Sequence, residues 1–393
     1  MFEAVIVSAC RTPIAKFQGK LASMRAPQLG AIVIAEAVKR AGIASADVEE
    51  VIFGNVLQAG LGQNPARQAA IAAGIPVTVG SMTINKVCGS GLKAVALAAQ
   101  AIKAGDANII VAGGQESMTN SPYLMPGARD GLRLGHGKLL DSMVSDGLWD
   151  VYTDFHMGTT GDLVAERCAV TRDDQDRFAA ESHRRAAAAM ASGAFKKEIV
   201  QVELKGRKGE VTLVDSDEGV RADTTVEGLA KMKPAFGPTG TVTAANASQI
   251  SDGAAAVVVM SAAEAQKRGL KPLAKITGYA VGGTEPKWVM MAPIYAVQNL
   301  VKKNGIAIDS YDLIEVNEAF SSAACAVGKE LKLDPARTNV NGGAVALGHP
   351  IGASGCRILV TLLHALEARG GRRGLATLCL GGGNAVALSV ERI

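Results

Sequence analysis

The sequence has few aromatic residues, only 4% of its 393 positions, and it has no long hydrophobic run. The apolar stretch from Ala254 to Ala263 is among the longest, and it is far shorter than the roughly 18–20 residues that cross a bilayer. The N-terminal residues also lack the basic start and the long apolar core of a signal peptide. We therefore expect neither a membrane segment nor a secretion signal.

The sequence also lacks closely spaced cysteines and a strong excess of one charge. Its six cysteines are widely scattered and form no C-x-x-C pair, which argues against a disulfide framework and against a structural zinc site. We therefore expect a reduced, cytoplasmic compartment. The 41 basic and 37 acidic residues nearly balance, so nothing points to nucleic-acid binding. The 48% of apolar residues excludes a disordered chain, and the length suffices for two or three domains.

Strands alternate with helices through the first part of the chain. This alternation predicts an α/β fold with a mainly parallel sheet that is covered on both faces. The expected elements are the strands Ala4–Ser8, Val51–Gly54, Ser81–Val87 and Asn108–Ala112, the last ending in Gly113–Gly114, and the helices Leu29–Ala41, Pro65–Ala73 and Leu92–Ala104.

The last part of the chain repeats this plan. Gly42 and Gly305 each end a predicted helix, and Gly91 and Gly355 each open one, at nearly the same separation along the chain. This match indicates an internal duplication. The repeated elements are the helices Ala296–Asn304 and Cys356–Ala368, the strands Leu313–Val316 and Leu375–Leu380, and a glycine turn at Gly381–Gly383.

The middle of the chain has a different character. It contains a charged helix at Thr171–Ser192, which begins at a Thr171-x-x-Asp174 cap, and a charged hairpin at Ile199–Val214. We therefore predict three domains. Residues 1–118, completed by about 249–271, form the N-terminal half-domain; residues 119–248 form an inserted loop domain; and residues 272–393 form the C-terminal half-domain.

Cys88 is the candidate nucleophile. It stands between a predicted strand and a helix that starts near Gly89, where unpaired N–H groups stabilise a thiolate or hold an oxyanion. A buried, inert cysteine is the alternative. A nucleophilic cysteine needs a base, and His349 lies in the loop before the duplicated helix start, so both would face one crevice at the carboxyl ends of the strands.

Two further positions are candidates: Cys379 reaches the same crevice by this argument, and Asn317, an ordinary capping residue when taken alone, could hold a water or a carbonyl oxygen there. Cys379 ends a buried strand beside Gly381–Gly383, and Asn317 lies where a strand gives way to a helix. The two cysteines and His349 could instead bind zinc, but no short-spaced ligand pair favours this. A regulatory disulfide between Cys88 and Cys379 is a further alternative, which a reduced compartment disfavours.

Four segments resemble the catalytic motifs of the thiolase family, in family order and over essentially the full chain. They are Asn85–Gly91, Asn317–Phe320, Gly348–Pro350 and Cys379–Gly383. The resemblance implies two duplicated βαβαβαββ half-domains with an inserted loop domain that binds coenzyme A (CoA) and makes oligomer contacts. It also implies acyl-CoA substrates, a homotetramer or homodimer, and no metal or redox cofactor, because CoA is itself a substrate or product.

The resemblance also implies roles for individual residues. Cys88 would attack an acyl-CoA thioester with help from His349, and Cys379 would take an α-proton from a second acetyl-CoA. A water held by Asn317 and His349 would form one oxyanion hole, and the N–H groups of Cys88 and Gly381 the other. The CoA path would run from Arg221 at the nucleotide end along Leu148, His156, Met157, Phe236, Ala244, Ser248, Ala319 and Phe320.

The expected reaction is the reversible Claisen condensation of two acetyl-CoA molecules to acetoacetyl-CoA and CoA. One segment departs from the family pattern: Val289–Pro293, preceded by Trp288, stands where relatives that form acetoacetyl-CoA carry Met-Gly-x-Gly-Pro next to the acyl pocket. A broad-range 3-ketoacyl-CoA thiolase of fatty-acid degradation is therefore the near alternative. A ketoacyl synthase that condenses malonyl groups and a non-catalytic CoA-binding protein are the more distant ones.

Overall fold

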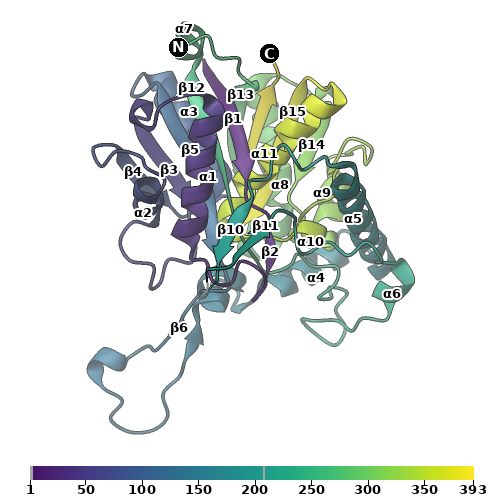
Figure 1. Cartoon of the computed structure of the whole chain (residues 1–393). Coiled ribbons are helices and arrows are strands. Elements are labelled where there is room, and N and C mark those ends of the chain that lie inside the picture. The colour runs from purple at the N-terminus through teal and green to yellow at the C-terminus, as the bar shows by residue number, and fades with distance from the viewer. Residues whose placement is uncertain (1–2, 207–208) are drawn as a thin grey trace.

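A single twisted sheet runs through the molecule in the computed structural model, which describes residues 3–206 and 209–393 (Figure 1). Nine of its strands follow the order β14–β15–β16–β13–β1–β12–β5–β3–β4, and β2 pairs with β12. Their bounds are β1 (Ala4–Arg11), β2 (Ala15–Lys16), β3 (Glu50–Gly54), β4 (Gly80–Ile84), β5 (Ile109–Ser117), β12 (Ser251–Ser261), β13 (Ala274–Gly283), β14 (Leu313–Val316), β15 (Arg373–Leu380) and β16 (Asn384–Glu391).

The strand order displays the predicted duplication. In the first half, β4, β3, β5, β12 and β1 lie side by side, and in the second half β14, β15, β16 and β13 follow the same pattern. The halves join where β1 pairs with β13 through only two residue pairs, Val5 with Lys275 and Ile6 with Ala274. One α/β half-domain per half of the chain is therefore confirmed as the fold class.

The prediction of a mainly parallel sheet is wrong. Within the described residues, only the pairs β3–β4, β3–β5 and β14–β15 are parallel, and the other pairs of this sheet are antiparallel. The reason is that β16 follows β15 through a tight glycine turn, and β12 and β5 are joined by the inserted segment and not by a crossover helix. Parallel pairing needs a crossover, which these strands lack.

Helices cover the sheet in layers. Helices α3 (Ser90–Ala104) and α11 (Ile351–Arg369) pack together in one core with strands of both halves. The outer helices are α1 (Ala26–Ala41) and α2 (Pro65–Ala72) on the first half, and α8 (Ala292–Asn304) and α9 (Ser321–Glu330) on the second. By length and hydropathy α11 could cross a membrane, but 83% of its apolar window is buried inside the protein, as in a core helix.

Two glycines predicted to end a strand lie inside it. Strand β5 continues through Gly113 and Gly114 to Ser117. A Cβ on Gly114 would lie 2.1 Å from the carbonyl oxygen of Gly352 in α11, and one on Gly91 would lie 2.7 Å from the amide nitrogen of Cys356. These glycines let β5, α3 and α11 approach closely, which brings the N-termini of the two central helices together.

The segment between β5 and β12 combines short strands with helices, one of them 21 residues long. They are β6 (Tyr123–Leu124), β7 (Leu140–Asp141), β8 (Trp149–Asp150), β9 (Phe155–His156), α4 (Met157–Arg167), α5 (Arg172–Ser192), β10 (Val202–Lys205), β11 (Val211–Val214) and α6 (Val226–Ala230). The capped helix at Thr171 and the hairpin are both present, although residues 207–208 of its turn lie outside the described part. The remaining helices are α7 (Ala262–Lys267) and the single turn α10 (Ala344–Leu347). The proposed domain boundaries themselves stay predictions.

An arm formed by β6, β7 and the loop between them projects from the body (Figure 1). It exposes large apolar side chains, with Leu134 fully exposed and Leu139 and Tyr123 each 65% exposed.

Candidate active site

Cys88 occupies a tight turn between β4 and α3. Strand β4 ends at Ile84, earlier than predicted, because the chain turns sharply at Val87, whose φ of 46° is unusual for a β-branched residue. The Ser90 hydroxyl holds this turn by accepting from the Lys86 N–H at 2.8 Å and donating to the Val87 carbonyl at 2.6 Å. The turn thus places Cys88 two residues before Ser90, the first residue of α3, with Gly89 between them as the N-cap.

The glycine turn after β15 packs against the Cys88 turn. A Cβ on Gly89 would lie 2.0 Å from Cδ2 of Leu380, and one on Gly381 would lie 3.3 Å from Cγ1 of Val87. Positive φ angles at Gly382 and Gly383 form the turn itself. Cys379, at the end of β15, is thereby brought to the nucleophile from the opposite half of the fold.

Cys88 is a thiol in the resting protein. Burial raises the pKa of the Cys88 thiol well above its usual range, and the nearby Cys379 raises it further. The backbone N–H groups of Cys88 and Gly381 lower the pKa, because both can hydrogen-bond a thiolate, but their effect is smaller than that of burial. Burial also raises the pKa of Cys379, to about 12. Two N–H groups therefore point at the reacting sulfur without ionising it.

His349 is a buried, neutral imidazole. Its Nδ1 lies 2.6 Å from the Ser354 hydroxyl oxygen on α11, and its backbone N–H donates to the Gln249 carbonyl at 3.0 Å. Burial and then the charge of Arg357 lower the pKa of His349 to about 3. The amide nitrogen of Asn317 lies 3.5 Å from both ring nitrogens, so these two side chains stand face to face.

Sequence reasoning missed Glu116, which lies at the carboxyl end of β5. Its carboxylate accepts from the N–H groups of Val56, Leu57 and Gly352 and from the amide of Asn55, at 2.7 to 3.2 Å. Burial raises the pKa of Glu116 to about 7, against the effect of these donors. It ties the N-terminus of α11 to the first half-domain. The sequence signal for Glu116 was an acidic residue near the end of a buried strand. The predicted strand ended too early, at Ala112, so this signal was overlooked.

A cavity of about 440 Å³ opens beside His349. Seven of the residues predicted for the site line it: Leu148, His156, Phe236, Ala244, Ser248, Phe320 and His349. The rings of His156 and Phe236 stack at 4.7 Å between centroids, and Phe236 meets Phe320 edge-on at 6.3 Å. The cavity is thus a largely apolar passage that ends at the buried imidazole.

Seven predicted residues do not line this cavity: the catalytic Cys88, Asn317, Cys379 and Gly381, described above, and three residues of the predicted CoA path, Met157, Arg221 and Ala319. Met157 and Ala319 are buried in the adjoining hydrophobic core, which also contains Cys379. Arg221 is exposed, and its backbone N–H donates to Nδ1 of His183. Whether Arg221 meets the nucleotide end of CoA stays a prediction.

The segment that departs from the family pattern, Val289–Pro293, packs against Cys379 through Met290. Val289 and Met290 are buried, and Sδ of Met290 is 3.8 Å from Sγ of Cys379. The next residue, Met291, instead contacts Cys168 at 3.8 Å. Trp288 is half-buried against the core that contains Cys379, and the guanidinium of Arg167 lies 4.2 Å from its ring centroid.

The zinc alternative finds no support in the described part of the chain, where no three His, Cys, Asp or Glu side chains are arranged to hold a metal ion.

Comparison with known proteins agrees with this arrangement. The family models for the thiolase N-terminal domain and the thiolase C-terminal domain match residues 4–263 and 270–392. The chain is 56% identical over 392 residues to an acetyl-CoA acetyltransferase of Pseudomonas aeruginosa and 55% identical to one of Cupriavidus necator, and each match covers the whole of both chains. The crystal structure of the Bacillus anthracis acetyl-CoA acetyltransferase superposes with a TM-score of 0.98 at 43% identity, covering all of this chain and 99% of that one. The chain therefore belongs to the thiolase family of acyltransferases.

Proposed function

We propose that this thiolase is an acetyl-CoA C-acetyltransferase, which condenses two acetyl-CoA molecules to acetoacetyl-CoA and CoA and also runs in reverse. The relatives with that name, 50–56% identical over nearly their full length, support the choice. The observation that carries it is that Cys88 and Cys379 lie near each other. The N–H groups of Cys88 and Gly381 act on the Cys88 sulfur, and the Met290 sulfur packs against that of Cys379.

The first half of the proposed reaction acetylates Cys88. His349 accepts the thiol proton through its uncharged imidazole, the sulfur attacks the thioester carbonyl, and CoA leaves with a proton. The N–H groups of Cys88 and Gly381 stabilise the oxyanion that forms. Each group in this half belongs to the chain, and CoA enters as substrate and leaves as product.

The second half forms the carbon–carbon bond. Cys379 passes its thiol proton to the neutral His349 and, as a thiolate, removes an α-proton from a second acetyl-CoA. The resulting enolate attacks the acetyl group on Cys88, and the released Cys88 thiolate takes the proton back from His349. Asn317 and His349 face each other at 3.5 Å and stabilise the enolate oxygen. Two separate oxyanion sites are needed, because the enolate and the tetrahedral intermediate carry charge on different oxygens.

An intact-mass measurement tests this proposal. The protein incubated with acetyl-CoA should gain the mass of one acetyl group, located on Cys88 by peptide mapping. An unchanged mass, or an acetyl group that maps to another residue, would contradict the proposal. A requirement for malonyl-CoA in turnover would favour the ketoacyl synthase alternative.

The acyl chain length is set in this proposal by Met290, whose sulfur lies against Cys379. Met290→Ala should raise kcat/KM for thiolysis of a six-carbon 3-ketoacyl-CoA relative to acetoacetyl-CoA by about tenfold, since filling a pocket with one or two methylenes changes binding by that order. Met291→Ala is the matched control, because Met291 contacts Cys168 instead. Equal rates for long and short substrates in the unaltered protein would instead favour a broad-range thiolase.

The pH profile should lack a histidine titration near neutrality. Since burial lowers the pKa of His349 to about 3, the imidazole is already neutral at pH 5, and its protonation state does not change between pH 5 and pH 8. We expect kcat/KM for acetoacetyl-CoA thiolysis to show no acid limb near pH 6.5. A limb centred there that disappears in His349→Asn would show that the free imidazole titrates normally.

We also propose that the protein is a cytoplasmic homo-oligomer, a tetramer or a dimer. The open edge of β4, where Met82 is 39% exposed, and the apolar arm of β6 and β7 support self-association. Light scattering of the purified protein measures the number of subunits.

A further inference from the structure

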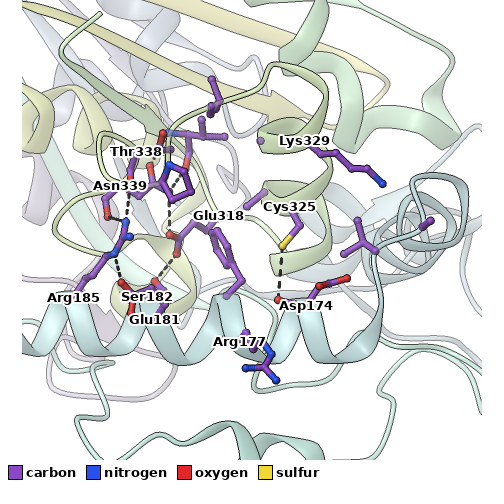
Figure 2. A pocket seen from close by; sticks show the side chains of 18 residues that line it. Asp174, Arg177, Glu181, Ser182, Arg185, Glu318, Cys325, Lys329, Thr338 and Asn339 are labelled. Carbon is purple, nitrogen blue, oxygen red and sulfur yellow. Dashed lines mark hydrogen bonds and ion pairs between the residues drawn. The ribbon is translucent and has the colours of Figure 1, made fainter. Parts of the chain in front are cut away.

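The carboxylate of Glu318, the residue that follows Asn317 in the chain, is buried. Glu318 is 1% exposed and forms part of the inner wall of a second cavity, of about 650 Å³, between α5 and α9 (Figure 2). The proposed reaction does not use this carboxylate. An acid with so little access to water must be held by its neighbours.

Three donors converge on the two oxygens of Glu318. The Ser182 hydroxyl on α5 donates to Oε2 at 2.7 Å, and the Val345 N–H donates to the same oxygen at 3.1 Å. The Asn339 amide donates to Oε1 at 2.9 Å. A Cβ on Gly343 would lie 2.3 to 2.6 Å from the carboxylate atoms, so the backbone at Gly343 packs closely against the group.

These contacts bracket Asn317 on both sides along the chain. Asn339 donates to the carbonyl of Val316 and accepts from its N–H, both at 2.8 Å, and the same amide binds Glu318. Asn339 has a left-handed φ of 47°, a strained backbone conformation that its hydrogen bonds to Val316 and Glu318 stabilise. The residues before and after Asn317 are thus clamped to one side chain.

Asn317 depends on this clamp more than His349 does. His349 has its own anchors in Ser354, Gln249 and the hydroxyl of Ser251. Asn317 has a backbone bond from its N–H to the Thr377 carbonyl at 3.0 Å. Among the described residues, its amide nitrogen reaches the His349 ring at 3.5 Å and its Oδ1 has no hydrogen-bond partner. A shift of the turn would therefore move Asn317 away from a fixed imidazole.

We propose that Glu318 is a positioning residue, which holds the Asn317 amide against His349 from behind and so maintains the oxyanion site for the enolate. This inference rests on the proposed function. A carboxylate suits the role because it accepts only, whereas the amide of a glutamine would set an NH₂ group against one of the three donors. Loss of the Glu318 carboxylate should therefore slow only the enolate step. The acetylation of Cys88 uses the N–H groups of Cys88 and Gly381, which lie on other elements.

Glu318→Gln separates the two half-reactions. We expect kcat for condensation to fall about 100-fold, the usual result of a small displacement in an active site. Exchange of labelled CoA into acetyl-CoA needs acetyl-Cys88 but no enolate, so it should keep its rate to within about threefold, with KM for acetyl-CoA equally little changed. Arg177→Gln is the control, because Arg177 lines the same cavity but is 68% exposed and pairs with Asp173.

Ser182→Ala provides a second, milder variant should Glu318→Gln not fold. It removes one of the three donors and should lower condensation about fivefold with exchange unchanged, in line with the loss of one hydrogen bond. Equal losses of condensation and exchange would overturn the inference, as would normal condensation in Glu318→Gln. If the unaltered protein shows no exchange and no acetyl adduct, the proposed function itself fails.

Discussion

Replacing Cys88 with serine is expected to lower acetoacetyl-CoA formation by about 10,000-fold or more, the scale seen when a covalent nucleophile is removed. The serine hydroxyl is nearly the same size as the thiol but far less acidic, so it gives up its proton to His349 much less readily and attacks the thioester poorly. Steady-state condensation and the intact-mass adduct should both vanish. The melting temperature should stay close to that of the unaltered protein.

Cys168→Ser is the matched control for this variant. Cys168 is half-buried and touches Met291, away from the reacting sulfurs, so its replacement should leave turnover unchanged. Retention of the acetyl adduct in Cys88→Ser would mean that another nucleophile carries the acetyl group.

Replacing Cys379 with serine is the second large expected effect. Condensation should fall about 1,000-fold, within the range that general acid–base groups contribute, because the α-proton loses its acceptor. The acetyl adduct on Cys88 should still form, since neither His349 nor the N–H groups of Cys88 and Gly381 change. The measurement compares the adduct by mass with deuterium exchange into the methyl group of acetyl-CoA.

The two measurements distinguish an acid–base role from a structural one. Loss of methyl exchange with a preserved adduct fits proton removal by Cys379. Loss of both would mean that the end of β15 supports the Cys88 turn, which is plausible on geometry because Leu380 packs directly on Gly89. Unchanged condensation would contradict the proposed role of Cys379.

Local patterns predicted the elements well where one residue type decides the geometry. Gly42 and Gly305 end helices in left-handed conformations with φ of 67° and 68°, as the sequence indicated, because only glycine adopts these angles without strain. Thr171 and Asp174 form the predicted capping box. Strand β14 has the predicted bounds, Leu313–Val316.

Local patterns gave the wrong element bounds where a glycine is required by close packing against a segment distant in the sequence. Gly113 and Gly114 resembled a strand end, but they lie inside β5 because α11 and β12 pack too closely for a side chain. The same error hid Glu116, four positions after Ala112, the last residue of the predicted strand. Gly352 and Gly355 similarly lie inside α11 and not before it.

The sequence alone was enough to identify a duplicated α/β chain and to nominate Cys88, His349, Asn317 and Cys379 as candidate site residues, since helix starts and strand ends are encoded within a few adjacent residues and the repeat recurs along the chain. Only the tertiary structure decided strand direction, the thiol state of Cys88, the neutral state of His349 and the clamp around Glu318. These properties depend on burial and on partners far apart in the chain, such as Ser182 and Asn339 on one carboxylate. Desolvation and hydrogen bonding act through space, so no local pattern records them.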